Sequence, residues 1–399
     1  MASRKFAAPR LATFVAIAIT GLACNIPEPD RNLRLASSAT PAAPTPPGDY
    51  TVPAGPLESS APAPFVVPRL AAAPFNATRV SLEDKAMGTH IVLAAFTTPE
   101  LDEAILRPKL EKALAEIRRL EGLMTTWRDD SEISRINAAA GKAPVVVGAE
   151  TLAVIEKSIW MSGRSEGVFD ITFEAMHGVW KFDQDHDEKI PAAANVERAR
   201  KLIDYRKIKV DSATSSVMLE QAGMRMSLGG IAKGYAVDAA ARVLEAERLP
   251  SYFVQAGGDL YVKGRKPDGA PWRVGVRDPR GKDATDYFAM LEVEDHAFST
   301  AGDYERGFVK NGKRYHHILD PRTGYPATAS RSVTIWAKDA FTADAIDDAV
   351  FILGAEKGLA LVESIEDCGA VIVDAQNKVW ISRRLKEKLH ILRAPTGGT

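Results

Sequence analysis

The chain has 399 residues and a formal net charge of −1, with 46% hydrophobic and 26% charged residues. This composition is typical of a globular protein with a sizeable core, and the near-zero charge argues against a nucleic-acid-binding protein. The sequence holds two cysteines, Cys24 and Cys368, which excludes a disulfide framework and a thiolate metal site. We expect Cys368 to be a small buried thiol.

An apolar run over residues 11–23 follows three basic residues at the N-terminus. The run is too short to span a bilayer but has the length of the apolar region of a signal peptide. It ends at Ala23-Cys24, which resembles the processing site of bacterial lipoproteins, although Gly21 stands where a large aliphatic residue is usual. We therefore expect residues 1–24 to be an export signal with lipid on Cys24. This predicts an exported lipoprotein of a bacterial inner membrane that faces the periplasm; ordinary cleavage near Ala23 is the alternative.

A segment rich in proline, alanine, serine and threonine follows over residues 25–78. It cannot bury enough apolar surface to fold, and its prolines favour an extended chain. We expect a semi-rigid tether between the anchor and a folded body, with an unstructured remnant of export as the alternative. The folded domain is predicted to span residues 79–390, and residues 391–399 are predicted to be a flexible tail.

The first part of the folded body is predicted to hold a strand, a long helix and a short capped helix. Residues 91–93 form an apolar run after a turn, which is typical of a strand. Apolar residues from Leu106 to Met124 recur every three or four positions, which predicts the buried face of a long helix. Ser131 is a suitable N-cap for the short helix that follows. Trp127 lies in the loop before it, where a tryptophan either covers the core or stacks on a flat ligand.

Two pairs of glycines mark the middle of the body. The pair at 229–230 leads into a predicted helix over residues 231–247, whose free backbone N–H groups would suit an anion together with Lys233. Tight packing of a strand on a helix is the alternative, because the spacing is not that of a P-loop. The pair at 257–258 interrupts a strand pattern over residues 252–262, which indicates a bulge or the close approach of a ligand.

The remaining elements indicate an α+β fold with an antiparallel sheet, because helices are mixed with hairpin-like strands. Strands are predicted over residues 208–210, 217–219, 272–278, 290–293, 333–337, 370–373 and 379–381, and helices over residues 197–203, 342–353 and 356–366. The helix at 342–353 carries Asp344 and Asp348 four residues apart on one face. Two such charges repel unless they are solvated or neutralised by a cation, and their apolar neighbours favour an enclosed site.

Residues 299–326 hold the densest group of polar and turn-forming residues in the chain. Four glycines and two prolines interleave with Thr300, Asp303, Arg306, His316, His317, Asp320 and Thr323. A simple connection would not need two adjacent histidines before an Asp-Pro turn, and a core strand would not carry this much charge. We expect this stretch to line a phosphate-handling active site.

Eight short motifs, taken together, resemble one known family. They are MGT at 87–89, MTTWRDDSEISRIN at 124–137, GVFDIT at 167–172, SLGGIAKGYAVD at 227–238, AGGD at 256–259, STAGDYERGF at 299–308, YHHILDPRTGYP at 315–326 and TADAIDDAVFILG at 342–354. In this order they are similar to the motifs of the FAD:protein FMN transferases, the ApbE-like flavin transferases, over roughly residues 80–385. The resemblance implies an α+β ApbE-like fold, related to the T-fold, with a mixed, mainly antiparallel sheet and flanking helices.

The resemblance also implies an activity. Family members are magnesium-dependent enzymes that use FAD as a substrate, transfer its FMN half to a threonine or serine hydroxyl of an acceptor protein, and release AMP. The implied partners are FAD, an exported or membrane redox protein as flavin acceptor, and the membrane through the N-terminal lipid; no nucleic acid is expected. In-line attack on a diphosphate requires neutralised phosphate charge and a base for the hydroxyl.

Site residues are carried over by their positions in the family's motifs. His317 is implied as the base or as a phosphate contact, with Asp303 as the reserve base. Mg²⁺ is implied to bind the carboxylates of Asp344 and Asp348 and the backbone carbonyl of Ala232. The residues implied to hold FAD are Met87, Trp127, Asn137, Asp170, Lys233, Gly257, Asp259, Thr300, Gly302, Asp303 and Arg306.

Three residues depart from the family's pattern. Trp127 stands where a tyrosine is usual and keeps an aromatic face for the adenine ring, and Ala301 stands where a serine is common. Asp348 stands where a metal-binding threonine is usual, so metal binding would persist or tighten while the extra negative charge would slow transfer. Two alternatives stay open: an FAD-binding lipoprotein without transfer, and an FAD pyrophosphatase in which water replaces the protein hydroxyl. A generic solute-binding lipoprotein would not explain the motif at 315–326.

Overall fold

The computed structural model describes residues 75–182 and 186–398. The predicted export signal and nearly all of the predicted tether therefore lie outside the described residues. Within the described ranges, no helix combines the length and the hydropathy that crossing a membrane requires.

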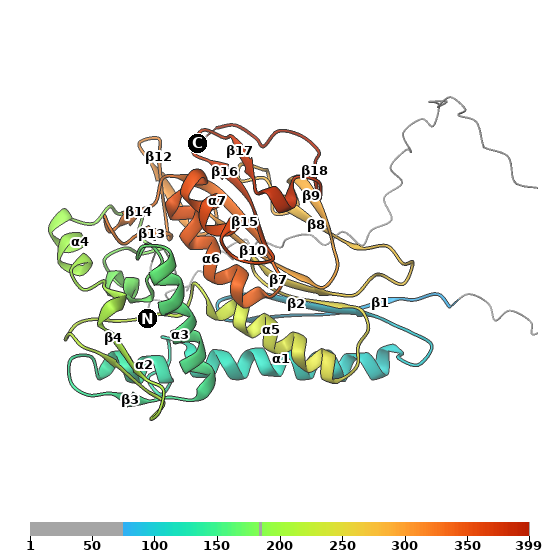
Figure 1. Cartoon of the computed structure of the whole chain (residues 1–399), viewed down its shortest axis with the longest axis horizontal. Coiled ribbons are helices and arrows are strands. Elements are labelled where there is room, and N and C mark those ends of the chain that lie inside the picture. Colours follow the sequence, from blue (N-terminus) through green and yellow to red (C-terminus); the bar gives the residue numbers. More distant parts are fainter. Residues whose placement is uncertain (1–74, 183–185, 399) are drawn as a thin grey trace, which may run out of the picture. The chain divides into compact units, whose positions relative to one another are not determined.

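The centre of the fold is an eight-stranded sheet (Figure 1) in which every neighbouring pair of strands runs antiparallel. In spatial order its strands are β1 (Arg79–Ala86), β2 (Thr89–Phe96), β6 (Tyr252–Ala256), β7 (Asp259–Lys263), β10 (His296–Gly302), β15 (Ser330–Ala337), β16 (Cys368–Asp374) and β17 (Val379–Ile381). The α+β fold with a mainly antiparallel sheet is confirmed. The predicted active-site stretch at 299–326 starts inside β10, a central strand.

Four helices cover one face of this sheet. They are α1 (Glu103–Met124), α5 (Ala232–Ala246), α6 (Ala340–Leu353) and α7 (Ala355–Glu363). The stripe from Leu106 to Met124 is buried as predicted, and it joins one apolar cluster with the inward side chains of the sheet, such as Leu93 and Val254. These helices carry the buried half of the candidate site.

Helices α5 and α6 touch through their backbones. A Cβ added at Gly234 would lie 2.2 Å from the carbonyl oxygen of Ala340 and 2.7 Å from Cβ of Asp344, so only glycine permits this approach. Asp238 of α5 also holds these two helices together. Its carboxylate accepts hydrogen bonds from the N–H groups of Ala340 and Phe341, at 2.9 Å each, at the start of α6. The contact brings residues at the start of α5 next to the acidic residues of α6.

A second, three-stranded sheet covers the other face. It is formed by β8 (Trp272–Arg277), β9 (Tyr287–Val293) and β18 (Leu389–Ile391). Its Trp272 and Phe288 pack in one cluster with Phe253 and Phe298 of the large sheet. Because the large sheet is covered on both faces, its central strands β6, β10 and β15 are buried along almost their whole length. Cys368 is buried, as predicted.

The residues after β18 are anchored at one carboxylate. The predicted flexible tail covered residues 391–399, but the described part of it bonds to Asp278. Thr396 donates its N–H and its hydroxyl to that carboxylate at 2.9 and 2.8 Å, and Arg393 forms an ion pair with it. The chain is therefore held against β8 up to these residues.

A smaller region lies between α1 and α5 in the sequence. It holds α2 (Glu132–Ala138), α3 (Ala149–Arg164), α4 (Ala193–Arg200), the short 3₁₀ helices η1 (Ile171–Met176) and η2 (Tyr205–Lys207), and a three-stranded sheet of β3 (Val145–Val146), β5 (Ser216–Leu219) and β4 (Ile208–Asp211). Ser131 caps α2 through a 3.0 Å bond from the N–H of Ser134, as predicted. The hairpin of β4 and β5 also matches its prediction, whereas α3 is a helix that the sequence analysis missed.

Two hairpins follow β10 along the chain. They are β11 (Gly307–Lys310) with β12 (Lys313–His316), and β13 (Leu319–Asp320) with β14 (Tyr325–Pro326); the short helix η3 (Arg383–Leu385) lies later. Trp180 stacks on Tyr315 at 5.9 Å and donates its indole N–H to the carbonyl of Gly324 at 2.9 Å. These contacts fix the hairpins, and with them the histidine pair at the end of β12.

Candidate active site

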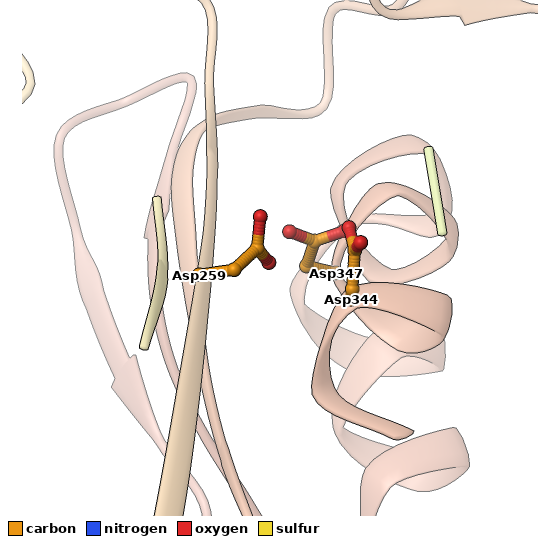
Figure 2. A group of neighbouring side chains, drawn as sticks. All are labelled: Asp259, Asp344 and Asp347. Atoms are coloured by element: carbon orange, nitrogen blue, oxygen red, sulfur yellow. The ribbon is translucent and has the colours of Figure 1, made fainter. Parts of the chain in front are cut away.

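Three buried carboxylates converge between the large sheet and α6. Asp259 extends from the start of β7, while Asp344 and Asp347 extend from α6 toward it (Figure 2). One oxygen of each lies within 4.8 Å of the others, and all three residues are buried. So much negative charge in a low-dielectric interior is unfavourable unless protons or cations neutralise it.

Ser299 of β10 lies between two of these carboxylates. Its hydroxyl oxygen is 2.6 Å from Oδ1 of Asp259 and 2.6 Å from Oδ2 of Asp347. A hydroxyl has one proton and can donate to only one of them, so the other short contact requires a proton on the carboxyl group. Burial and the neighbouring Asp344 raise the pKa of Asp259 to about 7. Burial and the adjacent Asp348 raise the pKa of Asp347 well above its usual range.

Lys233, at the start of α5, is the cation of this group. Its Nζ lies 3.0 Å from Oδ2 of Asp259 and 3.1 Å from Oδ1 of Asp344. Burial alone would lower the pKa of Lys233, but the charges of Asp259, Asp344 and Asp347 outweigh it and raise the pKa above its usual value. Asp344 also accepts the N–H of Gly234 at 2.7 Å, which ties α6 to the first turn of α5.

Asp348 lies next to this group but is not part of it. A Cβ added at Gly230 would be 3.1 Å from Oδ2 of Asp348, so the carboxylate lies over the glycine pair that precedes α5. Burial raises the pKa of Asp348 to about 6, against the opposing effect of Lys233. The side chain is only partly buried.

The converging group overlaps with the predicted metal ligands at Asp344. Its other members are Asp259, which was predicted to contact FAD, and Asp347, which was not predicted; the carbonyl of Ala232 and the carboxylate of Asp348 stay predicted ligands. Asp347 lies three residues after Asp344, and that spacing also shares a helix face. The converging group fits a hard divalent cation, because it offers carboxylate oxygens and more negative charge than Lys233 neutralises.

The two adjacent histidines have different environments. His316 is buried, lies 2.9 Å through Nε2 from the carbonyl of Ala327, and accepts the N–H of Ile318 at Nδ1 over 3.3 Å. These partners assign its proton to Nε2. Burial lowers the pKa of His316, and its ring packs edge-on against Phe351. His316 is thus a neutral structural group.

His317 has an imidazole nitrogen that nothing uses among the described residues. Its Nδ1 is buried and has no hydrogen-bond partner there, while its backbone N–H donates to the carbonyl of Arg306 at 3.1 Å. Burial, then the charges of Arg306 and His316, hold the pKa of His317 well below its usual value. A neutral imidazole with a free nitrogen can accept a proton, which suits the predicted base.

Asp303, the predicted reserve base, is fully engaged. Arg280 donates to both of its oxygens at 2.7 Å each, and Nε of Arg314 lies 3.9 Å from one of them. The carboxylate is buried in this bidentate pair. Its lone pairs are committed to guanidinium groups, so the geometry favours His317 over Asp303 as a base.

Two residues implied to hold FAD form hydrogen bonds with the backbone. Asn137 accepts the N–H of Met226 at 2.7 Å and donates to its carbonyl at 2.9 Å. Asp170 caps η1 through the N–H and hydroxyl of Thr172 and also accepts the N–H of Tyr205. Burial raises the pKa of Asp170. Both side chains shape loops, with their hydrogen-bonding capacity largely used.

The predicted glycines lie where strands approach closely. A Cβ added at Gly257 would be 2.5 Å from Oγ1 of Thr89, and one added at Gly258 would be 2.7 Å from the carbonyl oxygen of Thr300. The hydroxyl of Thr300 in turn lies 3.1 Å from that of Thr334. Gly302 ends β10, where a Cβ would meet the ring of Tyr304 at 2.5 Å. The glycine pair at 257–258 thus lies where the backbones of neighbouring strands approach closely, and the approach of a ligand stays a prediction.

Three predicted FAD contacts lie at more accessible positions. Trp127 is 66% exposed, so it does not cover the core, and the ring of His177 lies edge-on 6.2 Å away. Met87 has a positive φ of 53° and donates its N–H to Glu121 at 2.6 Å. Arg306 is exposed. His177 was missed because an isolated histidine carries no sequence signal.

Comparisons with known proteins show the family of this chain. The model of the ApbE family matches residues 87–372. An FAD:protein FMN transferase of Treponema pallidum is 33% identical over 299 residues, which cover 71% of this chain and 82% of that protein. An FAD:protein FMN transferase of Vibrio cholerae is 31% identical and is covered to 85%, with 72% of this chain aligned.

Solved structures give the same result. The ApbE protein of Thermotoga maritima superposes with a TM-score of 0.70 at 32% identity, covering 78% of this chain and 99% of that one. The flavin transferase ApbE of Vibrio cholerae superposes with a TM-score of 0.69 at 27% identity, covering 78% of this chain and all of that one. The chain belongs to the ApbE family of flavin transferases.

Proposed function

We propose that this enzyme transfers the FMN half of FAD to a threonine or serine hydroxyl of an acceptor protein, with the help of Mg²⁺, and releases AMP. The similarity to FAD:protein FMN transferases supports the flavin transferase class. One observation supports the finer proposal: the structure holds both a buried group of hard oxygen ligands and a buried, neutral histidine with an unused nitrogen. The charge of Lys233, which contacts the carboxylates, also acts on the pKa of His317.

The residues of the chain divide the chemistry between them. Asp259, Asp344 and Asp347 would hold Mg²⁺, which neutralises phosphate charge when bound. Lys233 adds positive charge at the N-terminus of α5, where a diphosphate would be favoured. His317 accepts the proton of the acceptor hydroxyl as its oxygen attacks the FMN-side phosphorus. The bond from that phosphorus to the bridging oxygen breaks, and the oxygen leaves with AMP.

The sequence before the described residues supports a proposal for the location of the enzyme. We propose that it lies outside the cytoplasm on a lipid anchor at Cys24, with an exported or membrane redox protein as its acceptor. The Cys24→Ala variant would then move from the membrane fraction to the soluble fraction. Retention of the variant in the membrane would contradict the anchor.

One assay tests the activity. The full chain is incubated with FAD, Mg²⁺ and a flavin-acceptor protein, and the products are separated on a denaturing gel and by chromatography. Flavin fluorescence on the acceptor band with an equal amount of AMP is expected, and chelation of the metal should remove both. Free FMN and AMP without a labelled acceptor would instead identify an FAD pyrophosphatase. Bound FAD without products would contradict both enzymes.

A further inference from the structure

Lys233 occupies oxygens that a metal ion would need. Its ammonium contacts one oxygen of Asp259 at 3.0 Å and one of Asp344 at 3.1 Å, and both carboxylates belong to the converging group. Mg²⁺ binds carboxylate oxygens at about 2.0–2.1 Å and would introduce two positive charges at the same place. An ammonium and a divalent cation so close together repel strongly inside a protein.

The side chain of Lys233 can reach a second position, beside the start of α5. It starts from the first turn of α5, and it is 25% exposed although both of its carboxylate partners are buried. Its Nζ is also 3.4 Å from the carbonyl of Gly229, in the glycine pair before the helix. The N-cap position of α5, Ile231, provides no side-chain hydrogen bond to the helix start. A phosphate group at this helix start would therefore attract the ammonium away from the carboxylates.

We infer that Lys233 is a tethered cation that shields the carboxylates in the free enzyme and is drawn to the substrate diphosphate when FAD binds, so that metal ion and FAD bind cooperatively. The inference rests on the proposed function, because it assumes that both ligands use this site. Binding of either ligand then favours the other by the same factor, since coupling between two sites is reciprocal. Metal alone must displace Lys233, whereas metal arriving with FAD finds the carboxylates already released.

The experiment measures Mn²⁺ binding to the full chain by electron paramagnetic resonance, with and without FAD and without acceptor protein. In the unchanged enzyme, FAD should tighten Mn²⁺ binding about tenfold or more, and Mn²⁺ should tighten FAD binding equally. In Lys233→Met, Mn²⁺ alone should bind about tenfold more tightly than in the unchanged enzyme, and FAD should add less. Lys233→Arg keeps the cation and should keep the weak binding of metal alone.

Lys263→Met is the matched control for loss of one positive charge. Lys263 is 30% exposed and pairs with Glu245 and Asp295 at 3.6 and 3.5 Å, outside the converging group. Its replacement should leave Mn²⁺ affinity within about twofold. The inference is overturned if Lys233→Met binds Mn²⁺ alone no more tightly than the unchanged enzyme, or if Lys263→Met tightens binding as much.

Thermal unfolding provides a second readout in case Lys233→Met folds poorly. The variant leaves the buried carboxylates without their cation, so Mn²⁺ should raise its Tm by more than it raises the Tm of the unchanged enzyme. An equal or smaller rise contradicts the inference. The unchanged enzyme could label an acceptor while Lys233→Met binds Mn²⁺ no more tightly than the unchanged enzyme does. That result would contradict the role of Lys233 and leave the proposed function standing. If the unchanged enzyme neither binds Mn²⁺ nor labels an acceptor, the proposed function itself fails.

Discussion

Two buried groups of charges lie along β10 and differ in their balance. Just after the strand, the carboxylate of Asp303 accepts hydrogen bonds from Arg280 and also lies 3.9 Å from Nε of Arg314. At Ser299, earlier in the strand, three carboxylates lie around the ammonium of Lys233. A carboxylate that guanidinium groups fully neutralise holds elements together, whereas an excess of buried negative charge favours the binding of a further cation. The group at Asp303 is therefore structural, and the group at Ser299 is suited to bind a metal ion.

Neutralising one carboxylate in each group gives the largest expected contrast. Asp344→Asn should slow flavin transfer about 1000-fold, since it removes a metal ligand, and should leave the Tm unchanged or higher because it relieves repulsion. Asp303→Asn should lower the free energy of unfolding by about 3–5 kcal/mol, because it leaves Arg280 buried without its charge partner. In-gel flavin fluorescence and thermal unfolding measure the two effects. The opposite pattern, in which Asp344→Asn unfolds and Asp303→Asn is folded but inactive, would make the Asp344 group structural and the Asp303 group functional.

The two histidines give a second contrast. His317→Ala should slow transfer by about 10²–10⁴-fold, as expected for loss of a general base, with little change in Tm. His316→Ala should cost about 2–3 kcal/mol of unfolding free energy, because it removes the contacts to Ala327 and Phe351. Unchanged transfer rates in His317→Ala would remove it from the role of base.

The excess of carboxylates around Ser299 also predicts how the free energy of unfolding depends on pH. The pKa of Asp259 is raised to about 7, so the folded state binds more protons than the unfolded state between pH 4 and 7. The metal-free enzyme should therefore lose unfolding free energy, on the order of 3 kcal/mol, as pH rises through that range. Thermal unfolding at pH 5 and 7.5 measures the loss, and saturating Mg²⁺ should reduce it. A metal-free Tm that rises between these pH values would contradict the excess of buried carboxylate.

Replacement of Asp348, which stands where the family usually has a threonine, is expected to have the smallest effect. Asp348→Thr removes a partly buried charge beside the converging group and introduces the residue usual in the family. The concentration of Mg²⁺ that gives half-maximal transfer should change by about threefold to tenfold, equivalent to roughly 1 kcal/mol. An unchanged Mg²⁺ dependence would place Asp348 outside the influence of the metal.

Elements with strong periodicity were predictable from the sequence, and long-range contacts were not. The stripe from Leu106 to Met124 predicted α1 because its apolar residues recur every three or four positions, which is the spacing of one helix face. Helix α3 was missed, and its buried face includes the hydroxyls of Ser158 and Ser162, which interrupt the apolar stripe. Each of them donates to a backbone carbonyl four residues earlier, so they can be buried.

The candidate site was predictable only in part for a related reason. Residue spacing places Asp344 on a face with both Asp347 and Asp348, and the packing of α6 against the large sheet turns Asp347 toward Asp259 and Ser299. Nothing local in the sequence reveals how α6 is rotated about its own axis. The backbone hydrogen bonds of Asn137 and Asp170 were not predicted, because polar side chains in loops look alike in the sequence whether they bind a substrate or a backbone.

The contact at Gly234 has a consequence for where the positive charge of α5 lies. It fixes how closely the helix that carries Asp344 approaches the first turn of α5, with no Cβ between them. A side chain at position 234 would move the two helices apart and lengthen the contacts of Asp344 with Nζ of Lys233 and with the N–H of Gly234, which are 3.1 and 2.7 Å. The absence of one carbon atom in the helix interface therefore helps to hold the ammonium of Lys233 against the buried carboxylates.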